Sequence, residues 1–214
     1  MFFLSAWAKP SFAMVFFLVM VLLLISDLLK KGEKNNFFYR LKRVIILGST
    51  AIPAGLYMLV LYRIVFKEDS SNSISIRFGF FLQQNYLIIL MVLTSMALPI
   101  IVLCFNFKKL KQEVPYKVAW AMFFVGLSEF LIFVEAGTRM QNGNFGWGRM
   151  FSGYFLFFMS AVVLIENYKD VNFLIQYPNL RKGYLLFAAL VGMLHIVSQL
   201  VYFLGILKGN NYFC

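Results

Sequence analysis

The chain has 214 residues, of which 61% are hydrophobic and 19% aromatic, and its mean hydropathy is +0.78. Soluble domains are typically about 45–50% apolar, so this composition excludes a water-soluble globular protein. The net charge of +11 does not indicate direct nucleic-acid binding, because the basic residues lie in short loops where membrane topology and anionic lipid headgroups account for them.

Six apolar segments are long enough to cross a bilayer, which takes about 20 helical residues. They span residues 12–29, 44–66, 86–105, 118–136, 147–167 and 184–207. The stretches between them are too short to form another domain. We therefore predict an all-α integral membrane protein with a single domain, residues 1–214, built as a polytopic bundle of about six transmembrane helices with short loops.

Positive charge distinguishes the two sides of this bundle. Most of the 20 Lys and Arg residues lie in the first, third and fifth loops between the predicted helices. The positive-inside rule places those loops in the cytoplasm, so both termini are predicted to face outward. No basic segment precedes the first apolar run, which favours a retained helix over a cleaved signal peptide. This pattern is typical of a protein of the bacterial cytoplasmic (inner) membrane.

The cysteines and the histidine do not indicate a metal centre. Cys104 lies in an apolar segment and Cys214 is the last residue, so they do not form a disulfide or metal-binding pattern. His195 is the one histidine of the chain and cannot make a His-rich site. We expect no metal and no cofactor.

An acidic and a basic residue meet at the outer end of the fourth predicted helix. Glu135 and Arg139 are four residues apart, which on a helix favours an ion pair. The pair either fixes the helix end or joins Arg149 in an outward-facing site for an anionic headgroup or ligand. We keep both interpretations open.

Residues 141–148 predict a tight outer hairpin rich in glycine and asparagine. Asn144 and its glycine neighbours suit turn conformations, and Trp147 suits an anchor at the membrane interface. The hairpin is either a turn with an anchor or a surface that contacts a ligand or partner.

Two ionisable residues are predicted at similar depth in the membrane. Glu129 and His195 each lie about 11 residues into their helices, and Gln199 continues a polar stripe from His195. Ionisable groups at membrane depth are costly and often functional, so this pair could relay protons or hold a cation. The alternative is a hydrogen-bonded lock between helices.

We expect a non-catalytic polytopic membrane subunit, forming a homo-oligomer, that acts as a sensor, anchor or gate with lipid or a soluble cytoplasmic partner. A stress- or phage-defence component is one such role. The first alternative is a transporter or channel for an ion or small solute that uses Glu129 and His195. The second is a membrane enzyme acting on an anionic lipid or glycan at the outer face. We lean against catalysis because the serines lack a nucleophile-elbow signature.

Overall fold

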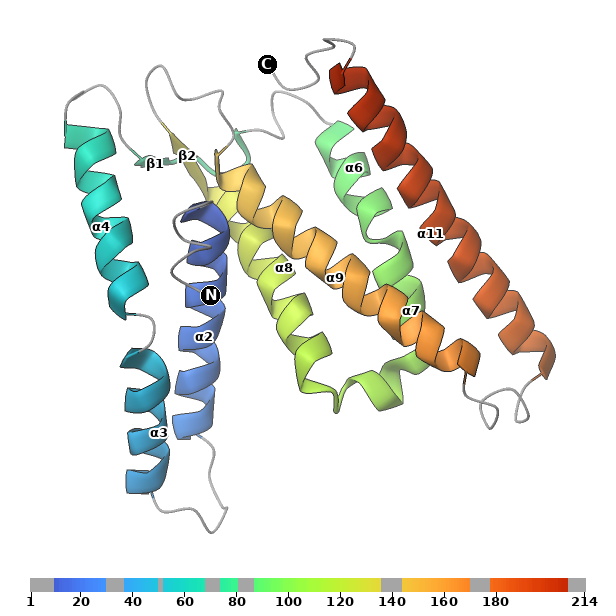
Figure 1. Ribbon diagram of the computed structural model, residues 1–214, viewed down its shortest axis with the longest axis horizontal. Helices are drawn as coiled ribbons and strands as arrows, with labels where there is room; N and C mark the ends of the chain where they lie inside the picture. Colours follow the sequence, from blue (N-terminus) through green and yellow to red (C-terminus); the bar gives the residue numbers. More distant parts are fainter. Residues whose placement is uncertain are drawn as a thin grey trace. The chain divides into compact units, whose positions relative to one another are not determined.

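The computed structural model describes residues 10–29, 37–49, 52–67, 74–80, 87–135, 144–169 and 178–207. Most of this part of the chain is helical, and its two short strands pair with each other (Figure 1). The helices are α2 (Pro10–Leu29), α3 (Phe37–Ser49), α4 (Ile52–Lys67), α6 (Leu87–Ser95), α7 (Ala97–Leu110), α8 (Val114–Ile132), α9 (Asn144–Lys169) and α11 (Pro178–Leu207). The strands are β1 (Ile74–Ile76) and β2 (Phe133–Glu135).

Three helices in the described part of the chain are long and apolar enough to cross a membrane. They contribute the segments Phe12–Leu29 of α2, Val114–Ile132 of α8 and Phe145–Lys169 of α9. A shorter apolar stretch, Lys182–Ser198, lies within α11. The predicted helical character is confirmed, and these three segments are compatible with a membrane protein. The number of six spans stays a prediction.

Two of the six predicted spans are each represented by two shorter helices. The second corresponds to parts of α3 and α4, and residues 50 and 51 between them lie outside the described residues. The third is divided between α6 and α7, with a turn at Met96. Pro99 explains that break, because it has no N–H to donate to the carbonyl of Ser95, the residue at which α6 ends.

The fourth predicted span ends earlier than residue 136. Helix α8 stops at Ile132, and β2 follows directly in an extended conformation. The backbone N–H of Arg77 donates to the carbonyl of Ile132 over 3.0 Å, and that of Gly79 donates to Leu131 over 2.8 Å. A segment distant in sequence therefore satisfies the free carbonyls at this helix end, which no local pattern could indicate.

The chain divides into two compact units, and each is described by itself. Unit 1 comprises Met1–Phe80 with Ala121–Ser152, and unit 2 comprises Phe81–Trp120 with Gly153–Cys214. Helices α8 and α9 contribute to both units. The single-domain prediction for residues 1–214 stays a prediction.

Unit 1 is built around α2. Helix α3 lies beside α2, and Ala13 of α2 is fully buried against Tyr57 and Met58 of α4 (Figure 1). Ala13, Val15 and Val19 of α2 are buried, whereas many of its other large side chains, such as Leu22, are exposed. The helix is therefore apolar on both its buried and its exposed faces, as expected for a segment surrounded by protein on one side and lipid on the other.

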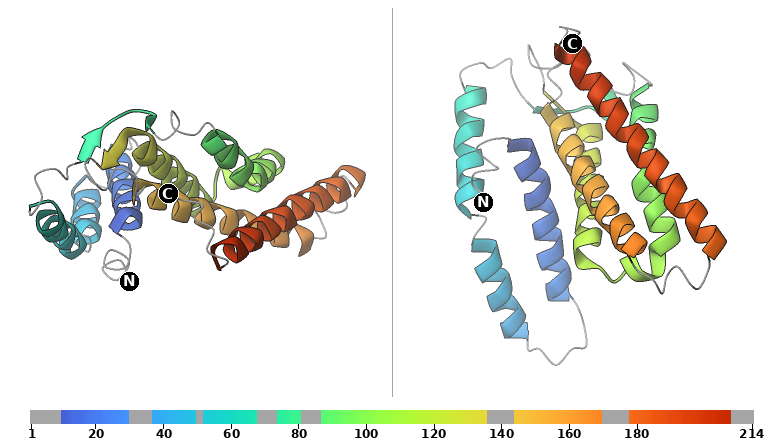
Figure 2. Two further views of the ribbon diagram at one scale, coloured as in Figure 1. Left: turned by 90° about the horizontal axis from the view of Figure 1, so that it is seen from above. Right: turned by 45° about the vertical axis from the view of Figure 1, so that its right-hand side comes forward.

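Unit 2 is held by α7, α9 and α11. Helix α11 contacts α7, and the right-hand view of Figure 2 shows the two helices side by side. Leu98 and Val102 of α7, Leu156 of α9 and Ala188 of α11 are buried in it. Polar side chains also link these helices, and they are described with the site below.

Candidate functional site

Glu129 occupies a core position of α8. Its side chain is 3% exposed, and it shares one face of the helix with Gly126 and Phe130. Met122 and Phe123, one turn before Gly126, are buried on the same face. The spacing of three and four residues along this face is that of a helix side that packs against protein. Glu129 therefore lies on the buried face of α8 and not on its exposed face.

Helices α8 and α9 cross closely beside Glu129. A Cβ atom placed on Gly126 would lie 2.8 Å from Ser152 Oγ and 3.0 Å from Arg149 Cα. Ser152 is itself buried and donates its hydroxyl hydrogen bond to the carbonyl of Gly148 over 2.7 Å. The absence of a side chain on Gly126 thus permits backbone contact between the two helices.

The contacts on either side of Glu129 give the register of this crossing. Gly126 meets Ser152, while Phe133, seven residues later, lies 5.6 Å from Phe145 between ring centroids. The two helical segments therefore run antiparallel. Arg149 of α9 lies at the level of Glu129 in this register, and its guanidinium sits over the ring of Phe130, 5.1 Å from the centroid. This arrangement is a cation–π contact between the two side chains.

The carboxyl group of Glu129 has no hydrogen-bond partner in the described part of the chain. Both of its oxygens, Oε1 and Oε2, are buried and unpartnered there. An ionised carboxylate in such surroundings is so unfavourable that it takes up a proton or is neutralised by a cation. The described residues therefore leave a buried carboxyl group without a hydrogen bond next to the α8–α9 crossing.

The structure changes the setting of Glu135. This residue lies in β2, opposite Ile74 of β1, and not at the end of a helix as the predicted span 118–136 placed it. Its side chain is buried. Arg139 lies outside the described residues, so the predicted ion pair between the two stays a prediction.

Residues 144–148 of the predicted hairpin are helical, and residues 141–143 lie outside the described part of the chain. Helix α9 already begins at Asn144, so Trp147 lies in a helical first turn and not in a loop. Asparagine is favoured at helix starts, which explains the early boundary. Trp147 is partly exposed and stacks on Phe151, with ring centroids 5.9 Å apart. Nothing is described for the side chain of Asn144.

His195 has its own neighbours within unit 2. Its imidazole hydrogen-bonds with the backbone of Thr94 on α6, and its ring meets Phe157 of α9 edge-on, with centroids 5.3 Å apart. Glu129 belongs to unit 1, so the predicted Glu129–His195 pair stays a prediction. Gln199 lies in α11, but its side chain is outside the described part.

A polar cluster that sequence analysis missed joins three helices of unit 2. Asn167 Nδ2 of α9 donates to Asn106 Oδ1 of α7 over 2.8 Å, and Asn106 Nδ2 donates to Tyr184 Oη of α11 over 3.1 Å. All three side chains are buried. Asn106 also has non-helical backbone angles, φ −122° and ψ 18°, so α7 bends where the cluster forms. An asparagine within an apolar segment was the available signal, since such residues often link membrane helices.

A second buried link lies in the same unit. Tyr116 Oη of α8 donates to the carbonyl of Pro99 over 3.2 Å and lies 3.3 Å from Ser160 Oγ of α9. Ser160 in turn donates to the carbonyl of Leu156 over 2.8 Å. These hydrogen bonds satisfy the groups that take part in them, which indicates a structural role.

Comparison of this chain with protein-family models, with curated proteins and with solved structures gives no match.

Proposed function

We propose that this chain is a multi-pass membrane protein that acts, without catalysing a reaction, as a proton- or cation-responsive gate or sensor centred on Glu129. The carrying observation is the buried carboxyl group with no described hydrogen-bond partner, in a helix apolar enough to cross a membrane. Folding alone would favour an apolar side chain at this position. A functional requirement is the simplest physical reason for a carboxyl group there.

The α8–α9 crossing supports a gating role. The helix backbones are in close contact at Gly126, so a change in volume or charge one turn away alters how α9 packs. Close-packed interfaces respond to such changes by switching between discrete arrangements. A proton or cation at Glu129 would favour one of these arrangements over the other. The predicted cytoplasmic basic loops, homo-oligomer and soluble partner belong to this proposal.

Transport of an ion or small solute is the second candidate function. It is favoured by the interruption of the apolar segment at Met96, between α6 and α7, and by the bend at Asn106. Breaks in membrane helices can free backbone carbonyls that bind ions in transporters, and at this break Pro99 has no N–H to donate to the Ser95 carbonyl. The predicted Glu129–His195 pair belongs to this candidate function.

Matched carboxyl substitutions test the primary proposal. The protein is reconstituted in liposomes, and hydrogen exchange of the α8 and α9 amides is followed while proton or sodium concentration is varied. Glu129→Gln keeps the shape of the side chain but removes its ionisation, and Glu166→Gln makes the same change at an exposed carboxyl group. We expect the wild type and Glu166→Gln to respond to protons or sodium. After correction for the intrinsic pH dependence of amide exchange, the protection of these amides should not change in the Glu129→Gln protein.

The result of this experiment decides whether Glu129 controls the packing of α8 and α9. An unchanged response in Glu129→Gln, or the absence of any response in the wild type, contradicts the gate proposal. A pH-sensitive dye inside the same liposomes separates the second candidate. Proton flux that Glu129→Gln abolishes favours transport, whereas a conformational response without flux favours a gate or sensor.

A further inference from the structure

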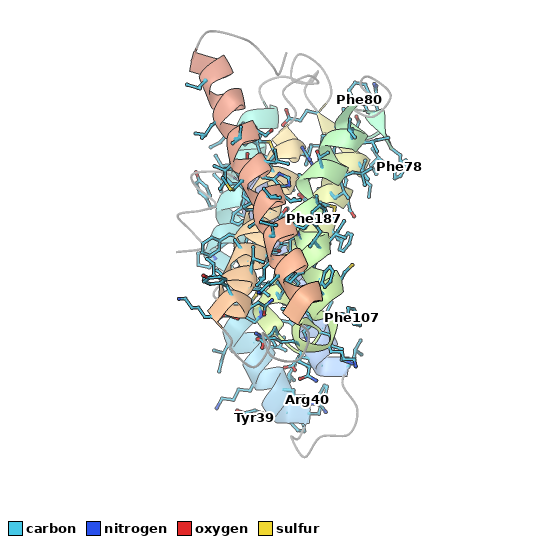
Figure 3. The ribbon with its side chains drawn as sticks, turned by 90° about the vertical axis from the view of Figure 1, so that its right-hand side faces the viewer. Tyr39, Arg40, Phe78, Phe80, Phe107 and Phe187 are labelled. Carbon is cyan, nitrogen blue, oxygen red and sulfur yellow. The ribbon has the colours of Figure 1, made fainter. Side chains whose placement is uncertain are left out.

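The segment around β1 carries large apolar side chains that unit 1 leaves exposed. Ile76 is 76% exposed and Phe78 is 73% exposed, and Ile74 is exposed as well. Figure 3 shows the side chain of Phe78 projecting away from the ribbon. Exposed apolar groups gathered on a short segment mark a surface that contacts a membrane, a ligand or another protein.

Strand pairing determines which side chains of the segment share a face. Ser75 pairs with Val134 of β2, and its hydroxyl donates to the Val134 carbonyl over 3.3 Å. Side chains alternate along a strand, so Ile74 and Ile76 lie together on the face opposite to Ser75 and Val134. Their partners on β2 are Glu135, which is buried, and Phe133, whereas Ile74 and Ile76 are themselves exposed. The two exposed isoleucines therefore lie on one side of a paired strand.

Hydrogen bonds hold this segment at the end of a candidate membrane span. The N–H groups of Arg77 and Gly79 donate to the carbonyls of Ile132 and Leu131, the last residues of α8. The span Val114–Ile132 also ends there. A segment bonded to the last turn of a spanning helix lies at the boundary between acyl chains and headgroups. Arg77, between Ile76 and Phe78, is exposed and suits an anionic headgroup at that depth.

We propose that Ile74, Ile76 and Phe78 insert into the boundary region of the lipid bilayer at the end of α8, with Arg77 directed to the headgroups. This inference rests on the proposed membrane embedding of α8. We assign the lipid surface as the partner of this segment for two reasons. The cationic Arg77 lies between the apolar Ile76 and Phe78, and the end of the α8 span determines how deep the segment lies in the bilayer. The segment then anchors the end of α8 beside the Glu129 site.

Single-cysteine labelling tests the insertion. Cys104 and Cys214 are replaced by serine, and the variants Ile76→Cys, Arg77→Cys and Phe78→Cys are labelled with an environment-sensitive fluorophore. Each is reconstituted in liposomes of phosphatidylcholine with anionic phosphatidylglycerol. We expect blue-shifted emission and quenching by shallow spin-labelled lipid for the labels at positions 76 and 78. The label at 77 should instead be quenched by iodide from the water phase.

A control position separates this inference from the proposed membrane embedding. Phe124 lies on the exposed face in the middle of the α8 span, so a label at Phe124→Cys should be quenched by deep spin-labelled lipid. Lipid quenching at 124 with equal iodide quenching at 76, 77 and 78 overturns the insertion and leaves the embedding intact. Iodide quenching at 124 overturns the embedding itself.

A second copy of the chain is the other possible occupant of this surface. Protection of positions 76 and 78 that persists in detergent and rises with protein concentration would show that a second copy covers the segment, and would overturn the lipid proposal. Protection that appears only with lipid supports it. Circular dichroism and gel filtration of each labelled variant establish that it is folded.

Discussion

Gly126 of α8 leaves no room for a side chain beside Ser152 of α9: an added Cβ would lie 2.8 Å from the Ser152 hydroxyl oxygen and 3.0 Å from backbone atoms of Arg149. Helices in membranes associate through such small residues because apolar surface alone gives little advantage over lipid. The crossing also lies one turn from Glu129, so packing and the candidate functional group are coupled at this point.

We expect Gly126→Ala to destabilise the protein by about 1–3 kcal/mol, because the added methyl group forces the two helices apart. The matched control is Gly183→Ala in α11, where a Cβ meets nothing within 4 Å. Alanine is the better helix former, so the control should gain about 0.5–1 kcal/mol. The free energy of unfolding in mixed detergent and SDS measures both. Equal effects at the two glycines would contradict the close crossing.

Replacing Glu129 by leucine should raise the stability of the folded protein. A buried carboxyl group without a hydrogen-bond partner opposes folding, and exchange for an apolar side chain of similar size can stabilise by about 1–4 kcal/mol. Glu166→Leu, at an exposed carboxyl group, should change the free energy of unfolding by only about 0.5 kcal/mol or less. A loss of stability in Glu129→Leu larger than in the control would show that Glu129 has a structural partner.

Asn106 and Asn167 should be energetically coupled. Asn167→Ala removes the donor to Asn106 Oδ1, and interhelical hydrogen bonds in membrane proteins contribute about 0.6 kcal/mol on average and up to about 1.7. A double-mutant cycle with Asn106→Ala isolates this contribution, measured as the free energy of unfolding. Gln112→Ala, at an exposed amide in the turn after α7, is the control and should have little effect. Additive effects of the two asparagine substitutions would contradict the link.

Tyr116→Phe should cost about 0.5–1.5 kcal/mol, the usual net contribution of a hydrogen bond. The substitution keeps the ring but removes the hydroxyl group that donates to the Pro99 carbonyl. Tyr168 is 71% exposed on α9, so Tyr168→Phe serves as the matched control and should be neutral. Thermal unfolding followed by circular dichroism distinguishes the two. Equal transition temperatures would show that the Tyr116 hydroxyl contributes nothing.

The ion pair between Lys109 and Glu166 should contribute little to stability. The two side chains are 50% and 57% exposed, and the N–O distance is 3.4 Å. Exposed pairs of this kind contribute about 0.2–1 kcal/mol, and salt screens them. A double-mutant cycle at low and high salt measures the coupling. A larger, salt-independent coupling would show that the pair is shielded from water in the native environment.

The elements that follow from the sequence alone are those with a strong local signal. Apolar length places α2, α8 and α9, because a run of about 20 apolar residues can satisfy its backbone only as a helix in lipid. The sequence also singled out Glu129, because an ionisable side chain at the predicted membrane depth has a high free-energy cost. The burial of Glu129 raises this cost further. The predicted pair with His195 and the cluster of Glu135 with Arg139 stay predictions.

Other features were decided by contacts between segments far apart in the chain. Helix α8 ends at Ile132 because Arg77 and Gly79 bond its last carbonyls, and Glu135 lies in a strand because Ile74 pairs with it. The side-chain partners of Asn106 are likewise 61 and 78 residues away. Composition and helical spacing determined that this chain is helical and apolar enough for a membrane. Only the tertiary structure decided where the helices end and which polar groups are paired. A hydrogen bond needs both partners within reach of each other, and the sequence does not show which distant residues come together.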